Sequence, residues 1–386
     1  MSDKIRNIVS TVAVALFIGV FAICCVVKLF NPSEYSEVEK RPFAKFPSDV
    51  TVEQLLANKE YKDPITGVDK KAPIKQFEDF TVDQFPLREF FRNIKVNFVL
   101  NVLGIKENNG YAEEDGSIAE IEPSFNSDNV DYQLGKIENI YNKYLTEHDK
   151  NVYFCLIPDK TYFFGRDYGY PTRDYEWLKS EIEKRLPEMT QIEIFDKLSL
   201  EDYYKTDWHW AQHKLLGVQG ALADGLGITV SGEYKENTLS DFRGGYTDMS
   251  ALYPSAEELI YLTNDVLDNC TVYDYETGGT LGLYNFELYE SKVQYDFFLS
   301  GSKSLLRIDN PAATEKREIV IFRDSFGANI IPLLAEGYSS IYVVDIRYIY
   351  PTAAIGAIGG FEGKDVLFLY SATVLSPKDL KASAFR

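Results

Sequence analysis

Hydrophobic positions are packed most densely near the start of the chain. Residues 8–27, IVSTVAVALFIGVFAICCVV, are twenty residues without a charge, which is the length a helix needs to cross the hydrocarbon core of a bilayer. Lys4 and Arg6 precede the run and place the N-terminus on the cytoplasmic side. The pattern predicts a membrane anchor over residues 1–30. A cleaved signal peptide is the alternative, although GVFAI is a poor cleavage site.

Polar and helical patterns follow the anchor. Residues 31–73 contain a polar, proline-containing stretch and are predicted to form an extracytoplasmic linker. From residue 74, apolar residues recur at spacings of three and four, which predicts two helices separated at Pro86. Glycine-containing turns predict a hairpin over residues 108–121, and residues 129–148 again have a helical pattern.

The pattern changes to short, continuous apolar runs, as expected of buried parallel strands. The runs are NVYFCLIP (151–158), IEIFD (192–196), EIVIFRD (318–324), SIYVVDI (340–346) and KDVLFLY (364–370). Helical stretches lie between several of them, at 173–186, 211–225 and 326–336. Such alternation predicts an α/β fold with a mostly parallel sheet and helices on both faces. Residues 228–317 are less regular and are predicted to hold inserted hairpins. We therefore expect one large domain over residues 74–386.

Composition narrows the class of protein. The chain of 386 residues is 45% hydrophobic and 26% charged, which is typical of a globular protein. Its net charge of −19 and pI near 4.7 argue against sequence-independent binding to nucleic acid, which needs a basic surface. Cys155 and Cys270 could form a disulfide outside the cytoplasm, but two buried thiols are the simpler interpretation.

One candidate nucleophile stands at the end of a predicted strand. The strand ends at Phe322, and Arg323-Asp324-Ser325 then turn into a helix. In open α/β sheets, reactive groups gather at the carboxyl ends of strands. Ser325 would stand beside backbone N–H groups of a helix start, which can stabilise an oxyanion. An ordinary helix cap is the alternative, because serine and aspartate are common there.

A candidate base for this serine lies in the segment TDWHW. In an extended segment, Asp207 and His209 would point to the same side, so the carboxylate could orient the imidazole, and Trp208 would face the opposite side. A metal site formed by Asp207, His209 and His213 is the alternative. It fails because Trp210 stands where the zinc-protease pattern needs glutamate, and no further ligand is near. We expect neither a metal nor a cofactor.

Together, TDWHW and FRDSFGANIIPLLAEGYSSIYVVDIRYIY resemble the bacterial DHHW protein family. That family is similar to the SGNH-hydrolase-like domains of the alginate O-acetylation proteins AlgJ and AlgX. The resemblance also includes the segments DQFPLREFF, NNGYAEEDG, LIPDKTYFF and TLSDFRGGY. The resemblance implies an SGNH-hydrolase-like domain with a triad of Ser325, His209 and Asp207. The sequence departs from the pattern at Trp208, where the family has histidine, and at Arg323, where the hydrolases have glycine.

Several other residues are candidates around this triad. The Ser325 N–H is the first oxyanion donor, and the second is predicted among Phe326, Asn329, Gly244 and Gly245. Arg347 follows the next strand, where it is either a substrate clamp or the partner of Asp345. Lys160 follows the strand that ends at Pro158 and is interpreted as a solvated loop residue.

The predicted function is therefore acyl transfer outside the cytoplasm. The resemblance implies an O-acetyltransferase, held by one helix in a bacterial cell membrane, that acts on a cell-surface or extracellular polysaccharide. A membrane-bound protein that transfers the acyl group would be its partner. An acetylesterase with the same triad and a non-catalytic polysaccharide-binding protein of the same fold are the alternatives.

Overall fold

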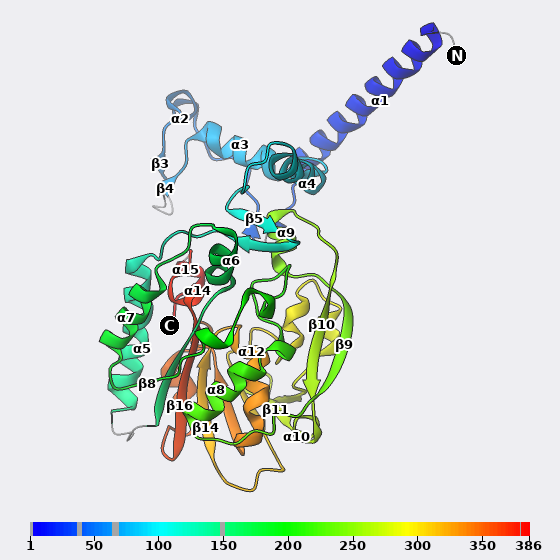
Figure 1. Cartoon of the computed structure of the whole chain (residues 1–386). Coiled ribbons are helices and arrows are strands. Elements are labelled where there is room, and N and C mark those ends of the chain that lie inside the picture. Colours follow the sequence, from blue (N-terminus) through cyan, green and yellow to red (C-terminus); the bar gives the residue numbers. More distant parts are fainter. Residues whose placement is uncertain (1–2, 37–40, 64–68, 147–150, 379) are drawn as a thin grey trace. The chain divides into compact units, whose positions relative to one another are not determined.

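The computed structural model describes residues 3–36, 41–63, 69–146, 151–378 and 380–386. They form two compact units (Figure 1). Unit 1 comprises Met1–Ile105 with Asp248–Tyr253, and unit 2 comprises Lys106–Thr247 with Pro254–Arg386. The domain boundaries predicted at residues 30 and 73 remain predictions.

Unit 1 is built mainly from helices. Helix α1 (Asp3–Phe30) contains one stretch, Ser10–Phe30, that is long and apolar enough to cross a membrane by length and composition, with a mean hydropathy of 2.7. The two helices predicted around Pro86 are confirmed as α3 (Pro73–Asp83) and α4 (Arg88–Asn97), and α4 continues as the π-helix η1 (Phe98–Val102). The smaller elements are β1 (Tyr35–Ser36), β2 (Arg41–Pro42), α2 (Val52–Ala57), β3 (Tyr61–Lys62) and β4 (Asp69–Lys70).

Unit 2 contains the predicted α/β sheet. Its eight strands lie in the order β12-β11-β13-β15-β14-β16-β7-β8, and the five strands from β15 to β8 are parallel. Three antiparallel strands at the other side come from the region predicted to be irregular. The bounds are β7 (Val152–Ile157), β8 (Thr190–Gln191), β11 (Thr271–Asp274), β12 (Gly279–Leu281), β13 (Leu305–Asp309), β14 (Glu318–Arg323), β15 (Ser340–Val344) and β16 (Lys364–Ser371).

Both faces of this sheet are covered, because successive side chains of a strand point to opposite faces. On β14, Ile319 and Ile321 pack with α8 (Leu216–Leu226), whereas Val320 and Phe322 belong to the core that faces three other helices. Those helices are α5 (Ser127–Tyr144), α7 (Tyr175–Arg185) and α13 (Pro351–Ile358). Figure 1 shows α5 and α7 on one side of the sheet and α8 on the other. The predicted fold class is confirmed.

Other predictions hold in part. The hairpin predicted over 108–121 is confirmed as β5 (Tyr111–Glu114) and β6 (Ser117–Glu120). The strand predicted at 192–196 is wrong: β8 ends at Gln191, and Phe195–Lys197 form a 3-10 turn, so only two residues pair with β7. The helix at 326–336 divides into α12 (Gly327–Ile330) and the 3-10 helix η6 (Ile331–Gly337), where Pro332 lacks a backbone N–H.

The remaining elements belong mostly to loops around the sheet. They are α6 (Lys160–Tyr168), β9 (Lys235–Phe242), α9 (Gly245–Ser250), β10 (Glu257–Thr263), α10 (Asp265–Asn269), α11 (Phe286–Tyr289), α14 (Ala372–Leu375) and α15 (Leu380–Ser383). Strands β9 and β10 form a separate antiparallel hairpin, as predicted for an insertion in this region. Cys155 and Cys270 are buried free thiols.

Candidate active site

The histidine-containing segment folds as a tight loop. Tyr203 and Trp210 form an antiparallel bridge, and the Tyr204 N–H donates to the carbonyl of His209 over 3.1 Å. The chain bends at every residue from Lys205 to His209, so the extended conformation predicted for TDWHW is wrong. Asp207 and His209 still meet, because the Asp207 Oδ1 accepts the backbone N–H of His209 at 3.0 Å and closes the turn.

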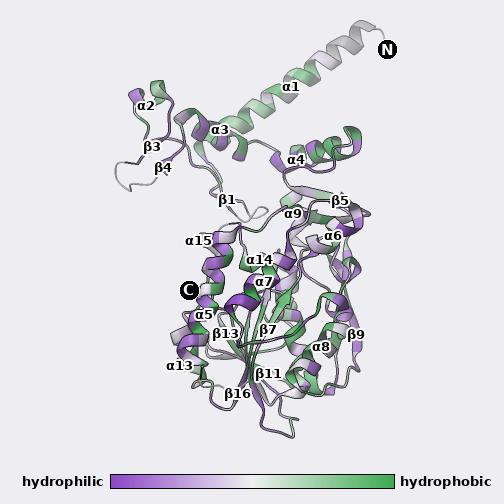
Figure 2. Cartoon of the chain, turned by 60° about the vertical axis from the view of Figure 1, so that its left-hand side comes forward, coloured by the Kyte–Doolittle hydropathy of each residue, from purple (hydrophilic) through white to green (hydrophobic). Residues whose placement is uncertain are grey.

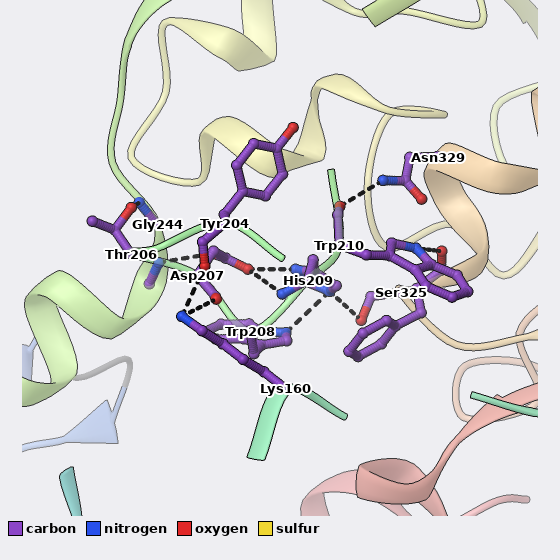
Figure 3. A network of polar contacts seen from close by, with 12 residues as sticks. Lys160, Tyr204, Thr206, Asp207, Trp208, His209, Trp210, Gly244, Ser325 and Asn329 are labelled. Carbon is purple, nitrogen blue, oxygen red and sulfur yellow. Dashed lines mark hydrogen bonds and ion pairs between the residues drawn. The ribbon is translucent and has the colours of Figure 1, made fainter. Parts of the chain in front are cut away.

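The loop brings Asp207, His209 and Ser325 into one line of hydrogen bonds (Figure 3). The His209 Nδ1 lies 2.7 Å from the Asp207 Oδ1, and the His209 Nε2 lies 2.8 Å from the Ser325 Oγ. Asp207 and His209 are each 3% exposed, whereas Ser325 is partly exposed. The serine hydroxyl is thus the accessible member of the line, and the two other side chains are shielded from water.

Asp207 is held as a carboxylate. Burial raises its pKa, but the charge and hydrogen bonds of His209 and the Gly245 N–H outweigh burial, so the pKa of Asp207 lies below its ordinary value. The Gly245 N–H donates to the Asp207 Oδ2 over 2.8 Å. A Cβ at Gly244 would stand 2.3 Å from the Cβ of Asp207. The GG pair of FRGGY therefore allows the backbone to approach the carboxylate.

Ser325 is fixed by the carboxyl ends of two neighbouring strands. It follows β14, and the Asp324 Oδ1 accepts the Phe326 N–H at 2.9 Å. The other oxygen of Asp324 accepts the Ser371 N–H and hydroxyl, at 2.8 and 2.6 Å, at the end of β16. The Trp210 indole N–H donates to the Phe326 carbonyl over 3.0 Å. Asp324 thus braces the serine turn, and Trp210 ties it to the histidine loop.

The predicted second oxyanion donors all lie near the triad, but each donates to an internal acceptor. The Phe326 N–H binds Asp324, the Gly244 N–H binds the Thr206 Oγ1 at 2.9 Å, and the Gly245 N–H binds Asp207. The Asn329 Nδ2 donates to the Trp210 carbonyl over 2.8 Å. The first predicted donor, the Ser325 N–H, differs from these four: it has no hydrogen-bond partner among the described residues. The roles of these residues as oxyanion donors stay predictions.

The two arginines near the sheet edge are both engaged in the structure. The Arg347 Nε and Nη2 donate to the two carboxylate oxygens of Asp345, over 2.9 and 2.6 Å. This ion pair matches one of the two interpretations of Arg347, in which it is the partner of Asp345. Arg323 is 1% exposed, and its guanidinium donates to the carbonyls of Asp324 and Gly301 at 3.2 and 3.0 Å.

The interpretation of Lys160 as solvated is wrong. Its side chain is fully buried, and its Nζ donates to the carbonyls of Ile118, Tyr204, Lys205 and Asp207, over 2.5, 2.8, 2.8 and 3.3 Å. Burial lowers the pKa of Lys160 to about 7, against the opposing effect of the carboxylates of Glu257 and Asp207. Lys160 lies three residues after the end of β7, so the strand-end rule that selected Ser325 would also have selected it.

Two aromatic residues surround the imidazole. The Tyr295 ring stacks on His209 with a centroid distance of 3.7 Å and an interplanar angle of 2°. The Trp208 indole N–H lies 3.0 Å from the His209 Nε2, so Trp208 does not face away as predicted. A Cβ at Gly245 would stand 2.5 Å from the Trp208 ring, so this glycine makes room for the indole. Tyr295 comes from the region predicted to be irregular, where no sequence pattern indicates a site residue.

The fold and these contacts define an α/β protein with a Ser-His-Asp arrangement at the carboxyl ends of its parallel strands. No protein-family model matches the sequence, and no curated protein matches it by sequence. Solved structures are similar. A DHHW family protein from Eubacterium siraeum has a TM-score of 0.56 and 18% identity, over 72% of this chain and 95% of that chain.

Two further solved structures are similar to this chain. PatB1 of Bacillus cereus, with a sulfonyl adduct, has a TM-score of 0.55 and 18% identity, over 72% of this chain and 97% of that chain. The O-acetyltransferase domain of Pseudomonas putida AlgJ has a TM-score of 0.45 and 13% identity, over 71% and 95%. The predicted resemblance to the DHHW family is thus confirmed, and at 18% identity it is a likeness of fold.

Proposed function

We propose that this protein is a serine-dependent acyl-transfer enzyme, with Ser325 as nucleophile, His209 as base and Asp207 as the group that orients the base. One observation carries the proposal: the line of hydrogen bonds from the Ser325 Oγ through His209 to Asp207, with distances of 2.8 and 2.7 Å. A serine hydroxyl needs such a base, and the base needs an anionic partner that fixes its tautomer.

The first half of the reaction forms an acyl-enzyme. The Ser325 Oγ attacks the carbonyl carbon of an ester while the His209 Nε2 takes the hydroxyl proton. The tetrahedral intermediate then collapses, the bond to the leaving alcohol breaks, and the Nε2 returns the proton to that alcohol. Asp207 accepts the Nδ1–H throughout and stabilises the imidazolium. The product is an ester between Ser325 and the acyl group.

The oxyanion of that intermediate needs two donors, and we assign them to the Ser325 N–H and the Trp208 indole N–H. In the resting site the indole lies within hydrogen-bonding distance of the His209 Nε2. When the Nε2 has taken the serine proton it becomes a donor and no longer accepts the indole N–H. That N–H is therefore released beside the serine at the step in which negative charge forms on the substrate.

The second half transfers the acyl group to an acceptor hydroxyl. His209 deprotonates the acceptor, which attacks the Ser325 ester, and the proton returns to the Ser325 Oγ as the ester bond breaks. An acceptor sugar hydroxyl makes the protein an O-acetyltransferase, and water makes it an acetylesterase. We favour the transferase acting on a cell-surface or extracellular polysaccharide, because of the resemblance of TDWHW and its companion segments to the DHHW family.

The placement of the protein follows from α1. We propose that its apolar stretch Ser10–Phe30 crosses a bacterial cell membrane once and holds residues 74–386 outside the cytoplasm. A membrane-bound acyl-transferring protein would then supply the acyl group from the cytoplasmic side. Residues 31–73 are the proposed linker.

The test is acylation of the full chain in detergent with an activated acetyl ester, read by intact mass and by release of the alcohol. We expect a Ser325-dependent acetyl adduct and turnover that Ser325→Ala and His209→Ala abolish. His213→Ala is the matched control, because His213 lies outside the line of hydrogen bonds, and it should retain turnover. Oligosaccharide acceptors added to the acylated protein then distinguish transfer from hydrolysis.

A non-catalytic, polysaccharide-binding protein is the alternative function. Arg323 in place of glycine is the sequence feature that favours it, and in the structure the guanidinium is buried and donates to the carbonyls of Asp324 and Gly301. A serine-directed sulfonyl fluoride separates the two functions. Labelling that Ser325→Ala abolishes supports the enzyme, and equal behaviour of the wild type and both triad variants supports the binding protein.

A further inference from the structure

A continuous apolar surface runs along α4 and η1 in unit 1. Its members are exposed by 38% to 66%, although all are large and apolar. They recur three, four or seven positions apart, so they share one face of the helix. We call this surface the α4–η1 stripe: Leu87, Phe90, Phe91, Ile94, Phe98 and Val102. Such a contiguous exposed apolar patch marks a contact with something other than water.

The opposite side of the same helix is already occupied by protein. Val96 is fully buried. The Arg92 Nη2 donates to the carbonyl of Met249 over 2.8 Å, and the Asn93 Nδ2 donates to the carbonyl of Ala251 over 2.8 Å. These contacts fix which way α4 is rotated within unit 1. The stripe is therefore the face that unit 1 leaves uncovered.

The stripe is joined to the apolar helix α1 at two levels. At the end of α1, the Ser33 N–H donates to the Gln84 Oε1 and the Gln84 Nε2 donates to the Ser33 carbonyl, each at 2.9 Å. Deeper in α1, the Phe21 ring packs edge to face on Phe85 at 5.2 Å, and Phe85 packs on Phe91 at 5.5 Å. Figure 2 shows the hydrophobic colour along much of α1 and again in α4.

The contact between the Phe21 and Phe85 rings indicates how deep in a bilayer the start of the stripe would lie. Phe21 precedes Phe30, the last residue of α1, by nine positions, so it lies about 13 Å along the helix axis from that end. If α1 crosses a bilayer, a ring that touches Phe21 lies within the acyl chains or at their boundary. Phe85 and, through it, Phe91 are then held there by packing.

We propose that α4 and η1 lie in the surface of the bilayer that α1 crosses, with the α4–η1 stripe among the acyl chains. This inference rests on the proposed anchoring role of α1. The charges of α4 are partly paired, because Arg88 and Arg92 share the carboxylate of Glu89 and Arg88 also lies near Asp83, whereas Lys95 is exposed. Binding by the stripe is therefore mainly apolar in origin, and anionic lipid adds a smaller attraction that salt screens.

Photolabelling from lipid tests the proposal on the unmodified full chain. The protein is reconstituted into phosphatidylcholine vesicles that contain a lipid with a diazirine in its acyl chain, irradiated, digested with trypsin and mapped by mass spectrometry. We expect lipid adducts in α1 and in the peptide of residues 96–106, VNFVLNVLGIK. Peptides of the α7 region, far along the chain and charged, serve as the unlabelled control.

The outcomes separate the two proposals. Adducts in α1 without any in 96–106 overturn the stripe proposal and leave the anchor intact. Adducts in 96–106 without any in α1 overturn the anchor and the placement of the stripe through α1, and they retain only the contact of the stripe with lipid. No adducts in either overturn both proposals. Cross-links from 96–106 to a second copy of the chain in place of lipid identify a protein interface and overturn the membrane assignment.

A pair of variants then tests which face of the helix is inserted. Phe98→Glu with Val102→Glu places two carboxylates in the stripe, and labelling of 96–106 should fall by about tenfold or more because charge is disfavoured among acyl chains. Asn97→Glu with Asn101→Glu adds the same charges one position earlier, at exposed polar residues. Labelling should be retained there. An equal loss in both pairs would contradict insertion of the stripe.

Discussion

The histidine loop of unit 2 and the α4–η1 stripe of unit 1 use aromatic residues in opposite ways. In the loop, Tyr295 and Trp208 contact His209, and the imidazole is almost fully enclosed. In the stripe, Phe90 and Phe98 are at least half exposed although their helix is packed on its other side. The first set of rings encloses a polar site, whereas the second set leaves apolar surface uncovered by the protein.

The difference reflects how far apart the contributing residues are in the sequence. His209 and Ser325 are 116 positions apart, and only the closed sheet brings them together. The stripe comes from consecutive turns of one helix and needs no tertiary contact to exist as a surface. Changes in the loop should therefore affect chemistry and stability, and changes in the stripe should affect lipid contact alone.

The largest effect is expected at the nucleophile and its base. Ser325→Ala or His209→Ala should lower ester turnover by about 10⁴-fold or more, because the residues of a triad act as a unit. Turnover of an activated acetyl ester and thermal unfolding are measured together. Loss of turnover with an unchanged melting temperature fits a chemical role, and unaltered turnover contradicts the triad.

A smaller loss is expected at Trp208. Trp208→Phe keeps an aromatic ring and removes the N–H that we assign to the oxyanion, so kcat should fall by about 10²–10³ with little change in KM. Trp208→His restores a ring N–H and is the matched control, which should recover part of the rate. A fall confined to KM would show that the indole binds substrate and does not stabilise the transition state.

Lys160 should affect stability more than chemistry. Lys160→Met leaves the carbonyls of Ile118, Tyr204, Lys205 and Asp207 without their donor, and we expect a loss of about 3 kcal/mol in the free energy of unfolding. Lys205→Met removes an exposed lysine from the same loop and should cost less than about 0.5 kcal/mol. Denaturant titration compares the two, and equal losses would contradict the role of Lys160.

The same lysine gives a pH dependence with a defined sign. Burial lowers its pKa in the folded protein to about 7, below the ordinary value of about 10.4 in the unfolded chain. Between these values the unfolded chain binds more protons, so stability rises with pH. The cost of the buried charge is fully present below pH 7. We expect the free energy of unfolding, measured from pH 7 to 10, to rise more steeply with pH for the wild type than for Lys160→Met. Parallel slopes for the two proteins would contradict this.

The smallest effect on stability is expected in the stripe. Phe98→Glu with Val102→Glu should change the free energy of unfolding in detergent by no more than about 0.5 kcal/mol per site, since both side chains are exposed. The same variant should show the large loss of lipid labelling described above. A marked loss of stability would mean that the stripe packs against protein, and the contrast between the two regions would disappear.

Much of this arrangement could be predicted from local pattern. Continuous apolar runs located β7, β14, β15 and β16, and the strand-end rule selected Ser325 beside β14. The spacing of apolar residues also located α3 and α4 on either side of Pro86. These features depend on periodicity over a few turns or on one strand, so they are present in the sequence before any tertiary contact forms.

The remainder depends on contacts that local pattern does not contain. The run at 192–196 has the composition of a strand, but it leaves the edge of the sheet after two residues of β8 pair with β7. Asp207 and His209 meet through a turn closed by their own hydrogen bond, and this conformation places Trp208 beside the imidazole. The donation of Lys160 to four carbonyls requires three segments to be folded together.

The stacked ring of Tyr295 has a kinetic consequence. With one face of the imidazole against Tyr295, its edge near Trp208 and its Nδ1 on Asp207, the Nε2 of His209 exchanges protons only on the side where Ser325 lies. The departing alcohol and the incoming acceptor must therefore occupy the same position beside the Nε2, one after the other. The proposed enzyme should follow ping-pong kinetics, with parallel double-reciprocal lines as the acceptor alcohol is varied.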